Sequence, residues 1–263
     1  MRPRTGITFV LAALASAWIA PMSRAQSPAE MAQTAAYTAA HQNKDGGFSQ
    51  APGQPSSLGA THSALKILKH VGGSVPDVLA CVEYVNSCRV RGGGFSQTPG
   101  GKADLVTTAL GLMAAAELKI DDPEMIREAV AYLGKNARSF EEVRMSAAGL
   151  EATGVYSPDT PRWFHQLQGM RNAENSFGSG AAVPFITGGV TAAILRLGMP
   201  LEHRDAIVRA IKAGQRPEGA WSKDDGPPDL SSSYRIMRAM YMMREKPDID
   251  RLLAYVEIGR AHV

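Results

Sequence analysis

The sequence predicts an all-α protein built from helix-loop-helix repeats. A glycine-rich segment, GGFSQ followed by x-P-G, occurs at 46–53 and again at 93–100, 47 residues later, and a looser copy begins at Gly219. Each copy is followed by a stretch rich in small and aliphatic residues, and apolar residues at helical spacing precede it. A period of this length is typical of two-helix units that stack side by side.

Two weaker copies lie between the second copy and the last. FEEVRMSAAGLEATG has no glycine loop, whereas NSFGSGAAVPFITGG keeps an aromatic residue and a helix of small residues. A hydroxyl residue near the start of each following helix serves as the anchor, that is, the reference position from which the spacing of the copies is measured. The anchors, which are 47, 38, 45 and 42 residues apart, are Thr61, Thr108, Ser146, Thr191 and Ser233.

A further helix precedes each repeat loop, often with a proline in its first turn, where the missing N–H costs nothing. These preceding helices are expected at 28–41, 76–88, 123–134, 161–170, 202–214 and 247–256. Six preceding helices therefore face five following ones. This count predicts that the last following helix is missing through truncation at the C-terminus.

Both ends of the chain are predicted to lie outside the folded domain, which we expect to span 26–256. Residues 1–25 combine arginines, an apolar run over 7–20 and small residues before a cleavage point after Ala25, as in a signal peptide. We therefore expect export to the periplasm or outside the cell. The apolar run is too short for a comfortable membrane span, and no later stretch is apolar enough to replace it, so we expect no membrane span after cleavage. Residues 257–263 match a translated sequencing adapter and are expected to be a non-native tail, the alternative being a genuine polar end.

Charge and cysteine content narrow the function classes. The predicted signal peptide holds three arginines and no acid, so the remaining chain is neutral. Nucleic-acid binding therefore has no electrostatic support. Cys81 and Cys88 are seven residues apart, roughly 10 Å along one helix, which is too far for a disulfide.

The glycine-rich segment at 92–101 does not match the phosphate-binding loops that it superficially resembles. The G-x-x-x-x-G-K-[ST] pattern has Ser96 in place of its first glycine and Ala103 in place of its hydroxyl residue. The G-x-G-x-x-G pattern has Gln97 in place of its third glycine. The segment is better interpreted as a turn between two helices, with Phe95 packed between repeats and Asp104 as the cap of the following helix.

Together, the G-G-F/W loop, the Pro-Gly that follows it and the [SD]-L-x-x-[TS] helix start resemble the prenyltransferase and squalene-oxidase repeat of the terpenoid cyclase/protein prenyltransferase superfamily. Exported bacterial members that look like β subunits are the most similar in appearance. The resemblance implies an (α/α)6 toroid, in which the following helices form an inner ring and the preceding helices surround it. An open helical solenoid is the alternative fold.

In such a ring the N-termini of the inner helices would all point to one mouth, where unpaired N–H groups and aligned dipoles favour anions. Side chains in the first turns would then surround an anionic head group, with Ala, Leu, Met and Ile below it. The candidates are His62, Arg144, Tyr234 and Arg235. The alternative is that these residues cap helices or pair with nearby acids such as Glu141, Glu142 and Asp229.

The resemblance also allows a test for zinc. Zinc-dependent prenyltransferase β subunits open an inner helix with an Asp and place a Cys two positions later. Here Asp104 is followed by Val106 and Asp229 by Ser231, so neither position supplies the thiolate. Zinc is expected only if a diverged or truncated site exists, and we predict no other cofactor.

Two other enzyme classes are weakly supported. Squalene-type cyclases use an acidic D-x-D-D motif, but SKDDGPPD has Ser222 in place of the first acid. Polysaccharide-cleaving barrels use paired carboxylates, for which Glu117, Glu142 and Glu151 are candidates without an evident pairing.

We therefore expect an exported ring that binds an apolar or isoprenoid-like ligand, or a protein partner, rather than an enzyme. The alternative is a transferase resembling the β subunit of protein geranylgeranyltransferase or farnesyltransferase, with a diverged or truncated zinc site.

Overall fold

The computed structural model describes residues 26–261, with side chains through Glu257; the predicted signal peptide and residues 262–263 lie outside the described residues. The described chain contains eleven α-helices, one short 3-10 turn (η1, Gly180–Ala182) and no strand beyond isolated bridges. The all-α prediction is therefore confirmed.

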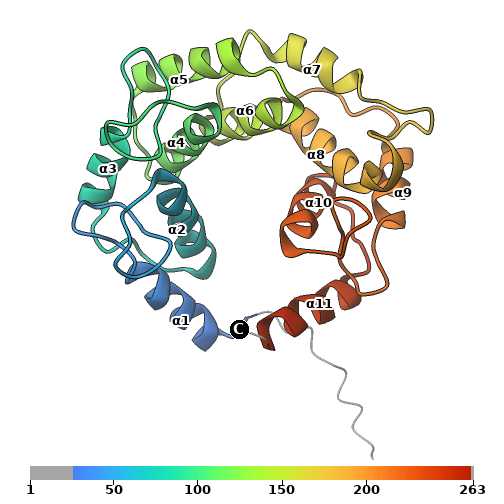
Figure 1. Cartoon of the computed structure of the whole chain (residues 1–263), viewed down its shortest axis with the longest axis horizontal. Helices are drawn as coiled ribbons and strands as arrows, with labels where there is room; N and C mark the ends of the chain where they lie inside the picture. The colour runs from blue at the N-terminus through green and yellow to red at the C-terminus, as the bar shows by residue number, and fades with distance from the viewer. Residues whose placement is uncertain (1–25, 262–263) are drawn as a thin grey trace, which may run out of the picture.

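The helices form two concentric layers arranged as a ring (Figure 1). The outer helices are α1 (Pro28–Ala39), α3 (Val78–Ser87), α5 (Pro123–Asn136), α7 (Thr160–Gln168), α9 (Arg204–Ala213) and α11 (Ile249–Ala261). The inner helices are α2 (Leu58–Val71), α4 (Leu105–Glu117), α6 (Phe140–Thr153), α8 (Val183–Arg196) and α10 (Leu230–Met242). Six outer and five inner helices match the count expected from the sequence, and α11 continues into residues 257–261 of the expected tail.

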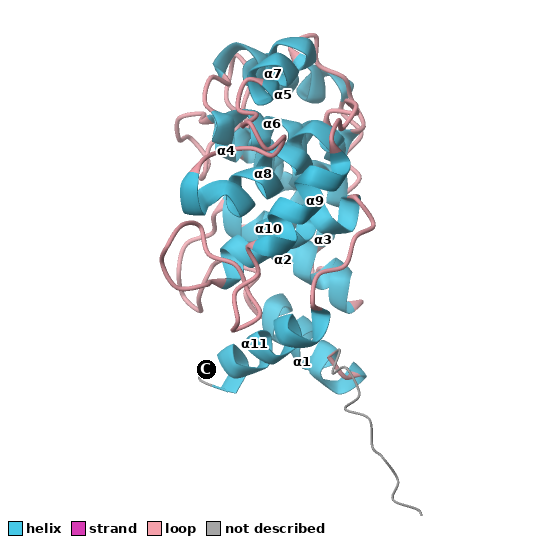
Figure 2. Ribbon diagram, turned by 90° about the vertical axis from the view of Figure 1, so that its right-hand side faces the viewer, coloured by secondary structure: helices cyan, strands magenta, loops and turns pink. Residues whose placement is uncertain are grey.

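Each inner helix packs against the next along the chain, from α2 to α4, α6, α8 and α10. The ring is open between α2 and α10, where α1 and α11 approach each other (Figure 1). Turned by 90°, the helices form a band, with connecting loops along its edges (Figure 2). The space enclosed by the inner helices is called the lumen below.

Local sequence explains where most inner helices begin. The side chains of Ser57, Asp104, Ser139 and Asp229 each accept a hydrogen bond from a backbone N–H in the first turn of α2, α4, α6 and α10. Such caps satisfy N–H groups that have no partner within the helix. The predicted capping role of Asp104 is confirmed.

The glycine loops place an aromatic side chain between the layers, as expected for Phe95. Phe95 and its three equivalents are almost completely buried, and in each case the backbone N–H of the aromatic residue donates to a hydroxyl on the following inner helix at 2.9–3.0 Å. The pairs are Phe48 with Thr61, Phe95 with Thr108, Phe177 with Thr187, and Trp221 with Ser233.

One anchor predicted from the sequence is wrong. In the fourth repeat, Thr187 rather than Thr191 receives the hydrogen bond from the aromatic residue. The hydroxyl of Thr191 lies one turn further along α8, buried and without a partner. Small residues fill both turns of this helix, so either register fits the repeat pattern, and only the packed loop distinguishes them.

The third repeat keeps its helices without a glycine loop. Residues 137–139 alone connect α5 to α6, so this connection has no loop aromatic to donate to Ser146. The hydroxyl of Ser146 donates to the backbone oxygen of Glu142 at 2.8 Å, as the hydroxyl does in other repeats. Helix α6 nevertheless packs against both α4 and α8. Continuous packing of the inner helices is therefore sufficient to hold a repeat in the ring.

Two further sequence expectations can be compared with the structure. Cys81 and Cys88 are buried and do not form a disulfide. Within residues 26–261, every helix is too short or too polar to cross a lipid bilayer.

Candidate functional site

The lumen contains a cavity of about 310 Å³ that is lined by side chains from all five described inner helices. Its wall includes Met113, Ala116, Ala148 and Ala152, together with a larger number of charged and polar residues. The charged side chains are arranged in clusters, each centred on one carboxylate.

Glu117, the last residue of α4, binds two lysines of α2. Its carboxylate accepts hydrogen bonds from Lys66 at 3.1 Å and Lys69 at 2.6 Å. Burial by itself would raise the pKa of Glu117, but the hydrogen bonds and charges of these lysines outweigh burial and lower it. Glu117 is therefore ionised at neutral pH and links α2 to α4.

Glu151 on α6 binds arginines from two other inner helices. Nε of Arg196 on α8 lies 3.0 Å from Oε2 of Glu151, and Nη2 of Arg238 on α10 lies 3.2 Å from the same oxygen. The Arg196 side chain is only 12% exposed, so its charge depends on this partner. The cluster ties α8 and α10 to α6.

The third cluster lies nearer the start of α6. Glu141 binds Arg144 of its own helix and Arg235 of α10, the latter through two hydrogen bonds of 2.6 and 3.0 Å. Arg235 also lies over the ring of Phe185, 4.2 Å from the ring centroid. A Cβ atom at Gly189 would come 2.8 Å from Cζ of Phe140, so the glycine leaves room for that ring, whereas its 3.5 Å distance from Cδ of Arg235 is an ordinary contact.

Taken together, the clusters give the lumen an excess of positive charge. Around the cavity two carboxylates face four cations, which are Lys66, Lys69, Arg196 and Arg238. The third cluster, which does not line the cavity, adds one carboxylate and two cations. A concave site of one sign concentrates the opposite charge from solution. The sequence analysis expected only apolar residues, Ala, Leu, Met and Ile, below the head group. Met and Ala do line the cavity, but charged residues lie among them.

The structure separates the four site candidates into two pairs. His62 and Tyr234 line the cavity, and the Tyr234 side chain is largely exposed there. Burial, followed by the charge of Lys66, lowers the pKa of His62 to about 4, so its ring is neutral at pH 7. Arg144 and Arg235 instead pair with Glu141, as in the alternative interpretation.

Several lumen residues were missed by the sequence analysis as ligand-binding candidates. They are Lys66, Lys69, Arg196 and Arg238. The signal for Lys66, Lys69 and Arg238 is a charged side chain three or four positions from another polar residue on the same helix face, and that for Arg196 is a lone charge at the end of a helix of small residues. Sequence spacing cannot show which helix supplies the partner.

The acids considered for catalysis have other roles here. Glu117 and Glu151 line the cavity but bind cations, and Glu142 forms a capping box with Ser139. Asp224 accepts a hydrogen bond from the backbone of Gly226 at 2.9 Å, within the exposed loop before α10.

The positions that hold zinc in prenyltransferase β subunits do not suit a metal in this chain. Asp104 binds the backbone N–H and hydroxyl of Thr107, and Asp229 binds those of Ser232 at 2.8 and 2.6 Å. Both carboxylates are therefore occupied as helix caps. Among residues 26–261, His, Cys, Asp and Glu side chains do not gather in any group of three that could hold a metal ion.

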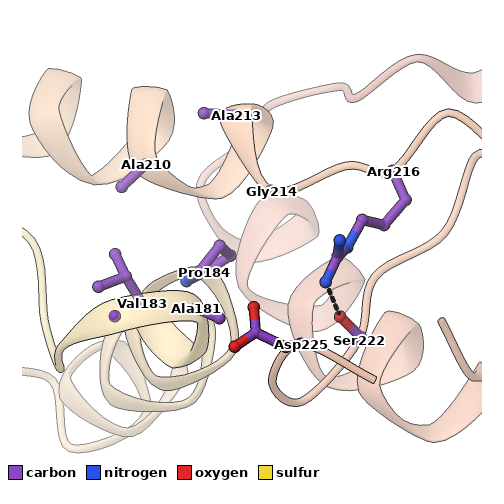
Figure 3. A pocket seen from close by; sticks show the side chains of 10 residues that line it. Ala181, Val183, Pro184, Ala210, Ala213, Gly214, Arg216, Ser222 and Asp225 are labelled. Carbon is purple, nitrogen blue, oxygen red and sulfur yellow. Dashed lines mark hydrogen bonds between the residues drawn. The ribbon is translucent and has the colours of Figure 1, made fainter. Parts of the chain in front are cut away.

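A second cavity, of about 410 Å³, lies between the start of α8, the end of α9 and the loop before α10 (Figure 3). Ala181, Val183 and Pro184 form one side, and Asp225 points into it from the loop. Arg216 donates to the hydroxyl of Ser222 at 3.1 Å and to the backbone oxygen of Asp224 at 3.0 Å. Arg216 therefore ties the loop before α10 to the end of α9.

The chain belongs to the prenyltransferase alpha-alpha toroid domain family, whose model matches residues 4–158 and 162–261. This match confirms the resemblance seen in the repeats and the toroid fold. A search of curated proteins finds no match to the chain.

Proposed function

We propose that this toroid is a binding protein whose lumen holds an isoprenoid-like ligand with an anionic head group. The observation that supports the proposal most directly is the excess of cations over carboxylates around a cavity with Met and Ala in its wall. Cations attract the head group, while the apolar side chains contact the hydrocarbon part. Ligand pockets commonly combine an apolar wall with a few placed polar groups.

Binding is favoured over catalysis by the state of the acidic residues. Hydrogen bonds and charges from neighbouring lysines or arginines lower the pKa values of Glu117 and Glu141 despite burial, so neither is suited to donate a proton at pH 7. Asp104 and Asp229, where a transferase would bind zinc, cap helices instead.

Titration of the purified protein with farnesyl diphosphate by isothermal calorimetry tests the proposal. We expect saturable binding that weakens as salt is raised, and weaker binding of the neutral alcohol farnesol. Arg127→Gln, on the outer helix α5, is the control because it removes a charge outside the lumen. Absence of saturable binding would reject the proposal. Transfer of the prenyl group to a cysteine peptide, with or without zinc, would favour the transferase alternative.

We further propose that the protein acts outside the cytoplasm, since residues 1–25 have the pattern of a signal peptide. Fractionation of cells that express the full chain is expected to show a processed form beginning at Gln26 in the exported fraction. A form that keeps residues 1–25 and stays in the cytoplasm would reject this assignment.

A further inference from the structure

The fourth repeat differs from the other glycine-loop repeats at the turn where its loop meets the next outer helix. Two positions before the loop aromatic, the other repeats have a glycine at which a Cβ atom would lie 2.0–2.7 Å from a backbone oxygen of the following outer helix; these are Gly46, Gly93 and Gly219. The fourth repeat has Asn175 there, with φ of +60° and the same turn hydrogen bond, which its backbone N–H donates to Asn172 at 3.1 Å. The Asn175 side chain therefore excludes equally close packing against α9.

A cavity of about 430 Å³ lies between this turn and α9. Val183, Ala210 and Ala213 line both this cavity and the one of about 410 Å³ in Figure 3, so the two cavities adjoin, away from the lumen. Together they are called the α9 cleft below. The shared residues are apolar, and the two alanines lie on the side of α9 that faces the start of α8 (Figure 3), where their small side chains leave space open.

Four charged side chains line the α9 cleft without forming an ion pair. Glu174 and Arg209 belong to the cavity beside the turn, and Asp225 and Arg216 belong to its neighbour. Among the described residues, no salt bridge includes any of the four, and only Arg216 makes side-chain hydrogen bonds. Each cavity therefore offers one guanidinium and one carboxylate that have no counter-charge.

The charges of α9 are used differently on its two sides. Arg204 and Lys212 both bind Glu245, at 2.8 and 3.3 Å, whereas Arg209 on the cleft side has no side-chain partner within the described chain. Arg216 uses only Nη2 for its two hydrogen bonds, so Nε and Nη1 remain as donors. One side of α9 thus holds the segment after α10, and the other keeps its charge for a partner.

A ligand with charge of a single sign fits the cleft poorly, because each cavity attracts it through one group and repels it through the other. An extended peptide can carry both signs. It also advances about 3.3 Å per residue, which lets one chain span two adjoining cavities.

We propose that the α9 cleft binds an extended peptide in which small apolar residues separate an acidic residue from a basic one. The acidic side chain pairs with Arg209, whose guanidinium is unpartnered among the described residues. The basic side chain pairs with Asp225, which points into its cavity (Figure 3). The small residues between them contact Val183, Ala210 and Ala213. This site is independent of the ligand proposed for the lumen.

Fluorescence anisotropy with labelled, end-capped peptides tests the proposal. The probes have Asp at one end and Lys at the other, in both orders, around a few positions filled with Ala, Val or Ser. We expect saturable binding that weakens as salt is raised, and weaker binding of peptides with Asp or Lys at both ends. Arg209→Gln and Asp225→Ala are each expected to weaken binding about two- to fivefold, whereas Arg127→Gln, on α5, is the charge control and is expected to bind as the wild type does.

Two further variants block the cleft. Ala210→Phe and Ala213→Phe each fill the apolar part shared by the two cavities and are expected to abolish binding of the peptides. Ala32→Phe, at an exposed position of α1, is the matched control and is expected to bind as the wild type does. Thermal unfolding of each variant shows whether it is folded.

The proposal is overturned if no mixed-charge peptide binds the wild type at millimolar concentration, or if folded Ala210→Phe and Ala213→Phe bind as the wild type does. It is also overturned if Arg209→Gln and Asp225→Ala both leave binding unchanged, since charge recognition is part of it. Titration of the two phenylalanine variants with farnesyl diphosphate is expected to match the wild type, so failure of either proposal is seen separately from the other.

Discussion

The loops that join outer to inner helices and the inner-helix surfaces that face the lumen follow opposite rules. Four of the loops repeat one contact, in which an aromatic backbone N–H donates to a hydroxyl at 2.9–3.0 Å. The lumen surfaces do not repeat: α2 contributes lysines and histidines, α4 and α6 each contribute a glutamate, and α8 and α10 contribute arginines. The comparison indicates that the repeated contacts build the ring, while the unrepeated side chains determine what it binds.

Phe95→Ala tests the repeated contacts most strongly. The side chain is 1% exposed, and its ring packs so closely on α4 that a Cβ atom at Gly111 would lie 2.5 Å from it. We expect a loss of about 3–5 kcal/mol in the free energy of unfolding, measured by urea denaturation. Tyr156→Ala, at an exposed tyrosine, is expected to change it by less than about 0.5 kcal/mol. Equal losses in the two variants would contradict the role of the loop aromatics.

Gly92 and Gly93 allow a sharper test, because both have φ of +92°. A Cβ atom at Gly92 meets nothing within 4 Å, whereas one at Gly93 would lie 2.7 Å from the backbone oxygen of Glu128 on α5. Gly92→Ala is expected to cost about 1 kcal/mol from backbone strain, and Gly93→Ala about 2–3 kcal/mol because the loop must also move from α5. Thermal denaturation measures the difference, and equal costs would argue against close loop packing.

Glu151→Gln tests the lumen. The substitution leaves Arg196, with 12% of its side chain exposed, without an ionised partner, and we expect a loss of about 1–2 kcal/mol in the free energy of unfolding. Glu124→Gln removes one half of an exposed pair with Arg127 and is expected to cost less than about 0.5 kcal/mol. If both variants are equally stable, the lumen ion pairs do not contribute to holding α8 and α10.

The smallest effect is the pH dependence due to His62. Its pKa falls from 6.5 to about 4 on folding, so between these values the unfolded chain binds a proton that the folded chain does not. Stability therefore decreases as pH falls through this window, with a slope of at most about 1.4 kcal/mol per pH unit. Urea denaturation of the wild type and of His62→Gln at pH 6 and pH 5 measures how much unfolding free energy each protein loses between these pH values. The variant is expected to lose less stability, and identical losses would contradict the neutral state of His62.

Periodic features were predictable from the sequence because each depends on residues close together in the chain. The loop aromatics, the cap at Asp104 and the alternation of outer and inner helices follow from local spacing, and the family match confirms the toroid. The fourth anchor was wrong by one turn, because α8 is uniformly small over Gly188–Ala193 and offers no local feature that fixes the register.

The content of the lumen depended on tertiary structure. Glu141 and Arg235 are 94 residues apart, and Arg238 and Glu151 are 87 apart, yet each pair meets because the ring places α6 and α10 on either side of a narrow α8. No sequence window contains both partners. The sequence by itself therefore determined a series of two-helix repeats, since repetition is a local property, and its resemblance to the toroid family predicted the ring. Only the packing of the inner helices against one another decided which charges meet in the lumen, because that depends on which faces of distant helices turn inward.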